Sequence, residues 1–276
     1  MKSISLIFLL AFFNIVVWSG IIGWDKNDAV YFLNVGQGDS ELIFLKNGVT
    51  ILVDGGPSKE VIYELEKILP SNRRYIDLVV LTHPDYDHYA GLINILDYYE
   101  FGVFLRGAAV NKSAAFKELE NKLEEFRISS RMVSAGDRVS VGPAKIEFIH
   151  SLDAAETPGK GDDSLIMIFE SSGAKVLFAA DCEIATLSEL AKGINLDADI
   201  LKIPHHGSRF GINGSLLEEI SPSIAVIEVG DNSYGHPAEA VVGALERNGV
   251  RYFRTDRDGT IKVSLSGDRM TAVKIK

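Results

Sequence analysis

The stretch Thr82-His83-Pro84-Asp85-Tyr86-Asp87-His88 places four side chains that can bind metal ions within six positions. It directly follows the mostly apolar run 76–81, which predicts a buried strand. Imidazole nitrogens and carboxylate oxygens are ligands for zinc and manganese, and a tight loop can turn alternate side chains toward two neighbouring ions. The stretch therefore predicts a metal-binding loop at a strand end.

Two further strand ends supply donors of the same kind. Asp181 follows the apolar run 177–180, and His205 follows the run 200–204. Two ions about 3.5–4 Å apart can share a hydroxide and stabilise both the attacking and the leaving oxygen of a displaced phosphate. We expect two divalent ions, zinc or manganese, bridged by Asp181, with catalysis centred on Asp87 and a ligand set of His83, Asp85, Asp87, His88, Asp181 and His205.

Polar residues next to these donors predict a substrate-binding surface. Ser208 and Arg209 offer a hydroxyl and a planar guanidinium that suit phosphate oxygens, and His206 lies beside them. His236 opens a predicted helix, where its imidazole could protonate a leaving alkoxide, and Asn232 flanks it. His150 stands apart from these loops, and we leave it outside the site.

A series of short motifs occurs in a characteristic order between about residues 30 and 263. The motifs are Val35-Gly36-Gln37-Gly38-Asp39-Ser40, Val53-Asp54-Gly55-Gly56, His83-Pro84-Asp85-Tyr86-Asp87-His88, Ala180-Asp181, Pro204-His205-His206-Gly207-Ser208, Tyr234-Gly235-His236-Pro237 and Arg254-Thr255-Asp256 with Gly259. This set resembles the metallo-β-lactamase superfamily. Within that superfamily, it is similar to the soluble C-terminal hydrolase domain of the ComEC family of competence proteins, which act in DNA uptake.

The resemblance implies a fold and a role for Asp54, and the sequence departs from the superfamily pattern at two places. The fold is an α/β four-layer αββα sandwich. Asp54 would orient metal ligands rather than bind metal. Asp85 stands where most members have a second histidine, as in the ComEC-like branch, and an oxygen donor there favours manganese beside zinc. The superfamily's middle histidine has no clear counterpart, since the segment offers Asp162, Asp163 and Ser164 instead.

Periodicity predicts mixed hairpins and helices, which suit two packed sheets with helices outside. The expected strands are 29–34, 40–45, 50–53, 76–81, 101–106, 131–133, 145–149, 165–170, 175–179, 200–203, 223–229, 251–254, 260–265 and 270–275. The expected helices are 59–69, 88–98, 113–126, with Ser113 as its cap, 183–192, 215–220 and 238–248. The irregular stretch 153–163 could cover the site.

Length, net charge and cysteine count limit the functions that the sequence allows. The 276 residues suit one large domain, and 28 basic against 38 acidic side chains give a net charge of −10. Such a surface repels nucleic acid at long range, so a polyanion must be gripped locally. Lys202, Arg209, Arg254 and Arg257 lie near the site motifs, although solvated surface positions are an equal alternative. Cys182 is the only cysteine, which excludes an intrachain disulfide.

The first residues differ from the rest. Residues 3–23 are uncharged and mostly apolar, with Trp18 and Trp24 where interfacial aromatics would lie. We expect residues 1–24 to be a signal peptide or membrane anchor and residues 25–276 to be the hydrolase domain, outside the cytoplasm.

Three functions remain open from the sequence. The leading hypothesis is a metal-dependent phosphodiesterase or nuclease that cleaves DNA and is related to DNA uptake. A DNA-uptake channel is the partner that this hypothesis would allow. The second is a metallo-hydrolase of small esters, lactones or lactams, which would use the same activated water. The third is a non-catalytic surface protein that binds DNA.

Overall fold

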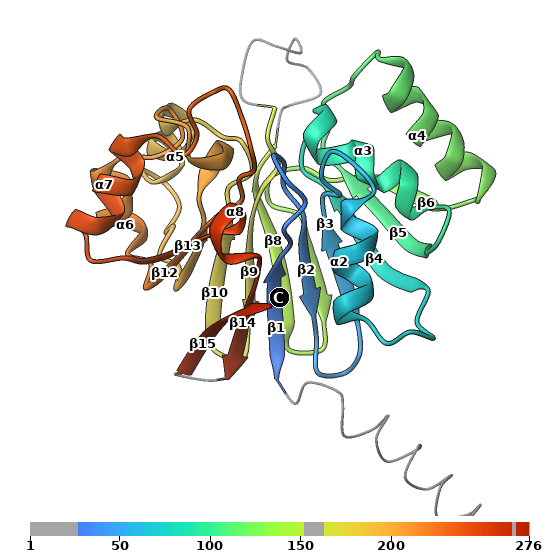
Figure 1. Ribbon diagram of the computed structural model, residues 1–276, viewed down its shortest axis with the longest axis horizontal. Helices are drawn as coiled ribbons and strands as arrows, with labels where there is room; N and C mark the ends of the chain where they lie inside the picture. The colour runs from blue at the N-terminus through green and yellow to red at the C-terminus, as the bar shows by residue number, and fades with distance from the viewer. Residues whose placement is uncertain (1–26, 152–162, 267–268, 276) are drawn as a thin grey trace, which may run out of the picture.

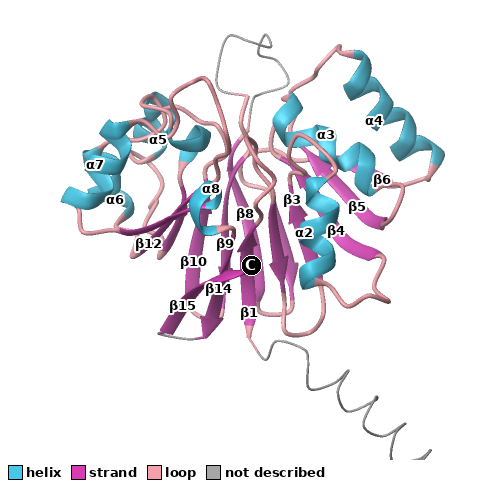
Figure 2. Cartoon of the chain, in the orientation of Figure 1, coloured by secondary structure: helices cyan, strands magenta, loops and turns pink. Residues whose placement is uncertain are grey.

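Two β-sheets lie face to face, and helices cover the outer side of each sheet (Figures 1 and 2). The computed structural model describes residues 27–151, 163–266 and 269–275. The predicted segment 1–24 and most of the stretch 153–163 lie outside these residues. No helix in the described ranges has the length and apolar character needed to cross a bilayer.

The first sheet contains the strands of the first half of the chain, and the second sheet contains those of the second half, except for the C-terminal hairpin. In the first sheet the order is β15 (Arg269–Ile275), β14 (Thr260–Ser266), β1 (Asp28–Phe32), β2 (Glu41–Phe44), β3 (Thr50–Val53), β4 (Tyr75–Leu81), β5 (Glu100–Arg106) and β6 (Ser129–Met132). In the second it is β13 (Arg251–Arg254), β12 (Ile224–Ile227), β11 (Ile200–Lys202), β10 (Ala174–Phe178), β9 (Ile166–Ser171), β8 (Ala144–His150) and β7 (Arg138–Val141). The C-terminal hairpin β14–β15 thus joins the first sheet beside β1.

Each sheet has its own helical cover. Apolar side chains of α2 (Glu60–Ile68), α3 (Tyr86–Ile95) and α4 (Ala114–Glu125) pack on the first sheet. Those of α5 (Ile184–Leu190), α6 (Gly214–Ile220) and α7 (Glu239–Arg247) pack on the second. A 3₁₀ turn, η1 (Pro204–Gly207), and the short helix α8 (Thr255–Asp258) complete the assignment. The predicted four-layer arrangement is therefore confirmed.

The central core lies between the sheets and follows from strand alternation. In β1, Val30 and Phe32 face the second sheet, whereas Ala29 and Tyr31 face the helices. The ring of Phe32 lies 6.3 Å from that of Phe178 in β10. Burial of such side chains stabilises the fold by about 1.5–3 kcal/mol each.

Parallel strands bring the predicted site loops to one edge of each sheet. Strands β3, β4, β5 and β6 are mutually parallel, as are β10, β11, β12 and β13. Their carboxyl ends therefore point the same way, and the loops that follow them lie together. At the opposite end, the Asp28 carboxylate accepts hydrogen bonds from Lys46 N (2.8 Å), Ser171 Oγ (2.6 Å) and Ser172 Oγ (2.9 Å), which fastens the start of β1 to both sheets.

Two local features differ from the sequence expectations, and a third agrees with them. Strand β7 was not predicted, because its residues are exposed or half-buried and carry no apolar run. Helix α3 begins at Tyr86 rather than His88, since Asp85 occupies the extended N-cap position. The predicted helix cap at Ser113 is confirmed, because its Oγ accepts a hydrogen bond from Phe116 N at 3.1 Å.

Candidate metal centre

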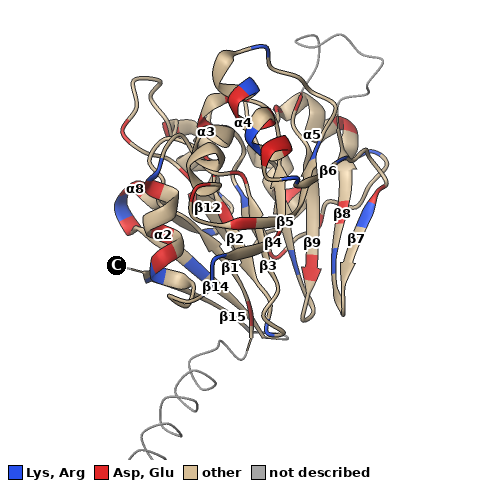
Figure 3. Cartoon of the chain, turned by 90° about the vertical axis from the view of Figure 1, so that its right-hand side faces the viewer, with Lys and Arg blue, Asp and Glu red and all other residues tan. Residues whose placement is uncertain are grey.

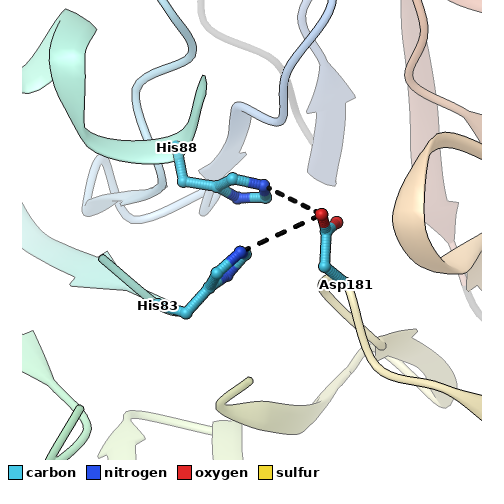
Figure 4. A group of neighbouring side chains, drawn as sticks. All are labelled: His83, His88 and Asp181. Carbon is cyan, nitrogen blue, oxygen red and sulfur yellow. Dashed lines mark ion pairs between the residues drawn. The ribbon is translucent and has the colours of Figure 1, made fainter. Parts of the chain in front are cut away.

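One carboxylate oxygen lies at the centre of a group of imidazoles. The Nε2 atoms of four histidines lie between 3.5 and 3.9 Å from Oδ2 of Asp181, namely those of His88, His205, His206 and His83. Figure 4 shows His83 and His88 directed toward Asp181 from the opposite side. The predicted convergence of distant loops thus occurs at Asp181, which follows β10.

Unusual backbone conformations aim these side chains. Positive φ values occur at Asp54 (54°), Ala180 (47°), His205 (50°) and His206 (54°). A non-glycine residue in this region costs on the order of 1–3 kcal/mol, and such residues gather at functional sites. The left-handed turn at Ala180 ends the β10 alternation and directs Asp181, while two successive turns bring both histidines after β11 back toward it.

Two residues fix the ring orientation of His83 and His88. The buried carboxylate of Asp54 lies 2.8 Å from His88 Nδ1 and also accepts hydrogen bonds from Thr82 N (2.8 Å) and Thr82 Oγ1 (2.6 Å). Since the Thr82 hydroxyl donates to Asp54, its oxygen is left to accept from His83 Nδ1 at 3.0 Å. Both rings therefore carry hydrogen on Nδ1 and present Nε2 to Asp181.

The ring of His206 is also oriented through its Nδ1, here by a backbone carbonyl that follows β12 of the second sheet. Its Nδ1 donates to the carbonyl of Glu228 at 2.9 Å, and its Nε2 lies 3.2 Å from Oδ2 of Asp87. The ring is 2% exposed, whereas that of His205 is 42% exposed. His206 therefore lies inside the cluster, and His205 lies at its rim.

Several buried nitrogen and oxygen atoms at this place have no hydrogen-bond partner among the described residues. They are His83 Nε2, His88 Nε2 and Asp181 Oδ1. Buried polar atoms are normally satisfied, so converging unsatisfied nitrogen and oxygen donors fit a bound cation. Three sets with ligand atoms within 4.8 Å of one another contain His88. They are His83, His88 and Asp181; Asp87, His88 and His206; and Asp39, Asp54 and His88.

The charges at the site are strongly coupled. Burial opposes ionisation of Asp181, but the facing imidazoles of His206, His88 and His83 hold its pKa well below the usual range. Burial likewise disfavours a charged His206, yet Asp181 and Asp39 raise its pKa to about 10. The pKa of His88 is also raised well above normal, against burial, by Asp181 and Asp54. Burial and then His88 lower the pKa of His83.

The remaining predicted ligands occupy the solvent side. The Asp85 side chain is 67% exposed, makes no cap hydrogen bond and has Oδ2 at 3.7 Å from His83 Nε2. Asp87 is 35% exposed and faces His206. Ser164 is buried, and Leu165 N donates to Thr82 O at 2.9 Å, so the segment that replaces the superfamily's middle histidine lies beside the metal loop. Asp162 lies outside the described residues.

The predicted substrate-binding residues differ in exposure and in the contacts that their side chains already make. The Ser208 side chain is buried and its Oγ accepts from Phe210 N, whereas the Arg209 guanidinium is exposed and lies 4.8 Å from the ring of Phe210. The Asn232 amide bonds four backbone groups, with Gly230 O and His236 O as acceptors and Tyr234 N and His236 N as donors. Asn232 therefore shapes the loop that carries His236.

His236 borders the cluster. Its ring lies 5.6 Å from that of His205 and 6.5 Å from that of His206. Partial burial and then the two neighbouring histidines lower its pKa. Its Nδ1 is buried without a hydrogen-bond partner in the described chain.

Sequence reasoning missed a buried charged group behind the cluster. Asp39, Glu41, Lys202 and Glu228 are each at most 2% exposed. The expectation that Lys202 could grip a polyanion is wrong, because its ammonium is enclosed and paired with Asp39. Strand alternation was the available signal, since Lys202 has the same parity as Ile200, which faces the inter-sheet core. Arg254 is also engaged, by Asp256 at 2.6 Å.

A family model described as the metallo-β-lactamase superfamily matches residues 33–230. The chain belongs to the metallo-β-lactamase superfamily. The superfamily fold binds divalent metal ions, usually two, and metal-dependent hydrolysis is its general activity. The His and Asp clusters around Asp181 are among the groups of the described residues that could hold such ions.

Relatives of this metallo-β-lactamase superfamily member include competence proteins. ComE operon protein 3 of Bacillus subtilis is 26% identical over 253 residues, which cover 84% of this chain and 32% of that protein. Competence protein ComA of Neisseria gonorrhoeae is 25% identical over 255 residues, covering 91% and 34%. The chain thus spans about a third of the length of these relatives. The metallo-β-lactamase fold protein YhfI from Bacillus subtilis has a similar structure, with a TM-score of 0.60 at 13% identity and coverage of 90% and 100%.

Proposed function

We propose that this protein is a metal-dependent phosphodiesterase that cleaves DNA in connection with DNA uptake. The observation that carries the proposal is the group of four imidazole Nε2 atoms around Asp181 Oδ2, with buried donors left unsatisfied. The similarity to competence proteins supports nucleic acid as the substrate. We further propose that residues 1–24 export the domain or anchor it in a membrane, with the site outside the cytoplasm and near an uptake channel.

The donor sets indicate how two ions, zinc or manganese, would be held. His83, His88 and Asp181 would hold one ion, with Asp85 at the solvent side, and Asp87 and His206 would hold the other, with His205 at its rim. Ions bound there would supply a Lewis acid and lower the pKa of water toward 7. The oxygen donors Asp85 and Asp87 make manganese a suitable occupant beside zinc.

The chain's own residues would prepare the reaction. Asp54 and Thr82 hold the rings of His88 and His83 with Nε2 free. We propose that Arg209, whose guanidinium is exposed and which follows His205 by four residues, contacts a phosphate oxygen. His236, at the rim, is the group that we propose to transfer a proton to the leaving oxygen.

Exposed aromatic side chains near the centre support a nucleic-acid substrate. Tyr86, Phe210 and Tyr234 are 60%, 57% and 76% exposed, and they lie in the same chain segments as Asp87, His206 and His236. The Tyr234 ring lies 5.8 Å from that of His236. Base stacking on such rings contributes about 1–3 kcal/mol per base without sequence preference.

A small ester, lactone or lactam is the second candidate substrate. The observation that favours it is the net charge of −10, which repels a long polyanion. Chromogenic esters compared with bis-p-nitrophenyl phosphate separate the two enzymes. Retention of DNA without turnover in excess metal would instead indicate the non-catalytic binder.

The test removes ligands without changing side-chain shape. Asp87→Asn and Asp181→Asn are assayed on a labelled single-stranded oligonucleotide with manganese or zinc. Cleavage should fall by more than about 100-fold, because loss of outer ligand partners alone costs 10–100-fold in metalloenzymes. Asp97→Asn, on an exposed site distant from the cluster, is the control and should cleave normally. Unchanged cleavage by both ligand variants would refute the proposed function.

A further inference from the structure

Lys202 lies at the inner end of the metal centre, between the two sheets. It is the last residue of β11, and its side chain is 0% exposed. Ile200, two residues earlier, belongs to the inter-sheet core, so alternation directs Lys202 into the same layer. Burial of a charged ammonium is unfavourable unless it is paired and hydrogen-bonded. Its partners therefore explain why a lysine is tolerated there.

The Lys202 ammonium joins the turn that carries Asp181. Its Nζ donates to the carbonyl of Ala180 at 3.1 Å and lies 3.9 Å from Oδ1 of Asp181. The same carbonyl accepts a hydrogen bond from His205 N at 3.0 Å. Ala180 has a φ of 47°, so these two donors stabilise a strained turn at the point where it directs Asp181 into the cluster.

The Lys202 ammonium also reaches the other sheet through Asp39. Asp39 lies in the loop between β1 and β2, and its Oδ2 forms an ion pair with Lys202 Nζ. The other oxygen, Oδ1, lies 3.2 Å from Nδ1 of His206. One ammonium thus connects, directly or through one carboxylate, to Asp181 and His206, two of the proposed metal ligands.

Further carboxylates enclose this ion pair. Ligand atoms of Asp39, Glu41 and Glu228 lie within 4.8 Å of one another, and all three side chains are at most 2% exposed. Glu228 Oε1 accepts a hydrogen bond from Ser40 N at 3.1 Å. Such a group attracts a cation, and the Lys202 ammonium occupies that role as part of the chain.

We propose that Lys202 is a positioning residue whose ammonium acts as a fixed internal cation and holds Asp181 and, through Asp39, His206 in metal-binding geometry. Without it, the Ala180 carbonyl loses a donor, and the buried carboxylate of Asp39 loses its ammonium counter-ion. The inference rests on the proposed two-ion centre, but it does not depend on the substrate.

The test measures metal binding rather than cleavage. Metal-free Lys202→Met is titrated with Co²⁺ by calorimetry, and the visible absorption spectrum of the bound cobalt is recorded. We expect affinity about 10–100-fold weaker than in the wild type, the usual loss when a residue that orients ligands is replaced. The cobalt spectrum should also shift, because the geometry of the ligands changes, whereas far-ultraviolet circular dichroism should stay unchanged.

Lys122→Met is a matched control. Lys122 makes the same kinds of contact away from the site, with Nζ at 2.6 Å from Asp97 Oδ1 and 3.0 Å from Ile93 O. This variant should bind cobalt with wild-type affinity and spectrum. Equal affinity and spectrum in folded Lys202→Met would overturn the positioning role. A wild type that binds no divalent ion would instead refute the two-ion centre itself.

A second variant covers the case in which Lys202→Met does not fold. Asp39→Asn keeps the side-chain shape and removes the charge that pairs with the ammonium. It should weaken cobalt binding at least about tenfold and shift the spectrum, by the same orienting logic. Wild-type affinity and spectrum in Asp39→Asn would refute the proposed link from Lys202 to His206.

Discussion

Each of the three buried histidines uses Nδ1 on a protein acceptor and keeps Nε2 for the cluster. The acceptors are Asp54, the Thr82 hydroxyl and the Glu228 carbonyl. Hydrogen bonds of this kind fix the tautomer and the ring plane and strengthen the free nitrogen as a ligand. The cluster is therefore prepared for a cation by residues that do not touch it.

Metal binding should release protons at neutral pH. In the metal-free protein the carboxylates around His206 raise its pKa to about 10, despite burial, and the pKa of His88 is raised as well. Ligation needs neutral imidazole, so at pH 7 binding should release about two protons and strengthen as pH rises. Calorimetry in buffers of different ionisation enthalpy measures this number. A binding enthalpy independent of the buffer would contradict the prediction.

The same shift predicts how the stability of the metal-free protein depends on pH. The folded pKa of His206, about 10, is above the ordinary value of 6.5, so its contribution is fully present below pH 6.5. That contribution is lost as pH rises toward 10. Thermal melting should show a loss of stability over this window, and His206→Gln should show a smaller one.

His236 should matter most for a poor leaving group. If it transfers a proton to the leaving oxygen, His236→Ala should slow cleavage of an oligonucleotide by about 100-fold or more. Cleavage of bis-p-nitrophenyl phosphate should fall far less, because p-nitrophenolate leaves without a proton. Steady-state rates on both substrates provide the comparison. Equal losses on both would indicate a positional role for the ring.

The sequence could not distinguish the two adjacent histidines after β11. His205 was predicted to bind metal because it directly follows the run 200–204, and His206 was predicted to contact substrate with Ser208 and Arg209. The structure places His206 inside the cluster and His205 at its rim, because both residues adopt left-handed backbone conformations. Such turns reverse the alternation, and no residue type in this stretch signals them.

At the scale of elements, helix α3 approaches the loop after β3 so closely that no side chain fits between them. A Cβ on Gly91 would lie 1.8 Å from the carbonyl oxygen of Gly55. The same contact places His88 against Asp54, since Gly55 N donates to His88 O at 2.7 Å. Glycine at position 91 is therefore a requirement of the metal centre as well as of packing.

Gly91→Ala should consequently affect both stability and metal binding. Overpacking of this kind typically costs about 1–3 kcal/mol, and displacement of α3 would turn His88 away from Asp181. Denaturant unfolding and a metal titration measure the two effects. Gly107→Ala is the control, because a Cβ there meets nothing within 4 Å. If Gly91→Ala binds metal normally, α3 does not set the ligand geometry.

The loops with exposed aromatic residues should bind bases. Tyr86→Ala and Tyr234→Ala should each raise KM for a single-stranded oligonucleotide by about fivefold or more, since one stacked base contributes about 1–3 kcal/mol. An abasic oligonucleotide should show no change. Tyr98→Ala, which removes a 57% exposed tyrosine beyond the other end of α3, is the control. Tyr86→Phe should retain the wild-type KM.

Most elements could be predicted because their apolar residues recur with a clear period. Strand β1 alternates between two apolar layers, and α2 buries Val61, Ile62 and Leu65 on one face. Strand β7 escaped prediction because it buries nothing fully. Amphipathic patterns record burial, so exposed edge strands leave little trace in the sequence.

At the scale of the molecule, the charge distribution limits how a nucleic acid could bind. Figure 3 shows acidic and basic residues interspersed along the helices on the side that faces the viewer. The loops that carry the site residues, 33–40, 82–88, 179–183, 203–213 and 228–238, contain one arginine, Arg209, and no lysine. Substrate affinity should therefore depend little on backbone phosphate contacts with basic side chains.

Salt titration checks this expectation. For a single strand, each phosphate neutralised by a basic side chain contributes a slope of about −0.7 to log K against log salt. The slope for this protein should lie near that value for one contact. A slope of about −4 would reveal a basic track that the described residues lack. Measurement at fixed metal concentration keeps the ions at the site constant.

The composition of the site was predictable, whereas its support was not. Histidines and aspartates at strand ends are informative because these residue types bind metal and because parallel strands end at one edge. Asp39 and Lys202 are 163 residues apart; Asp39 lies in the β1–β2 loop of the first sheet and Lys202 in β11 of the second. Their pairing follows from how the sheets face each other, which local patterns do not specify.

The hydrogen bonds of Asp28 bear on where the metal centre lies relative to the residues that precede β1. Strand β1 starts at the lower end of the molecule in Figure 1, and the loops around Asp181 lie beyond the opposite ends of the strands. Bonds to Lys46, Ser171 and Ser172 leave this attachment point little freedom to swivel. If the preceding residues form the tether that the sequence predicts, the metal centre should lie on the side of the domain that faces away from the lipid surface.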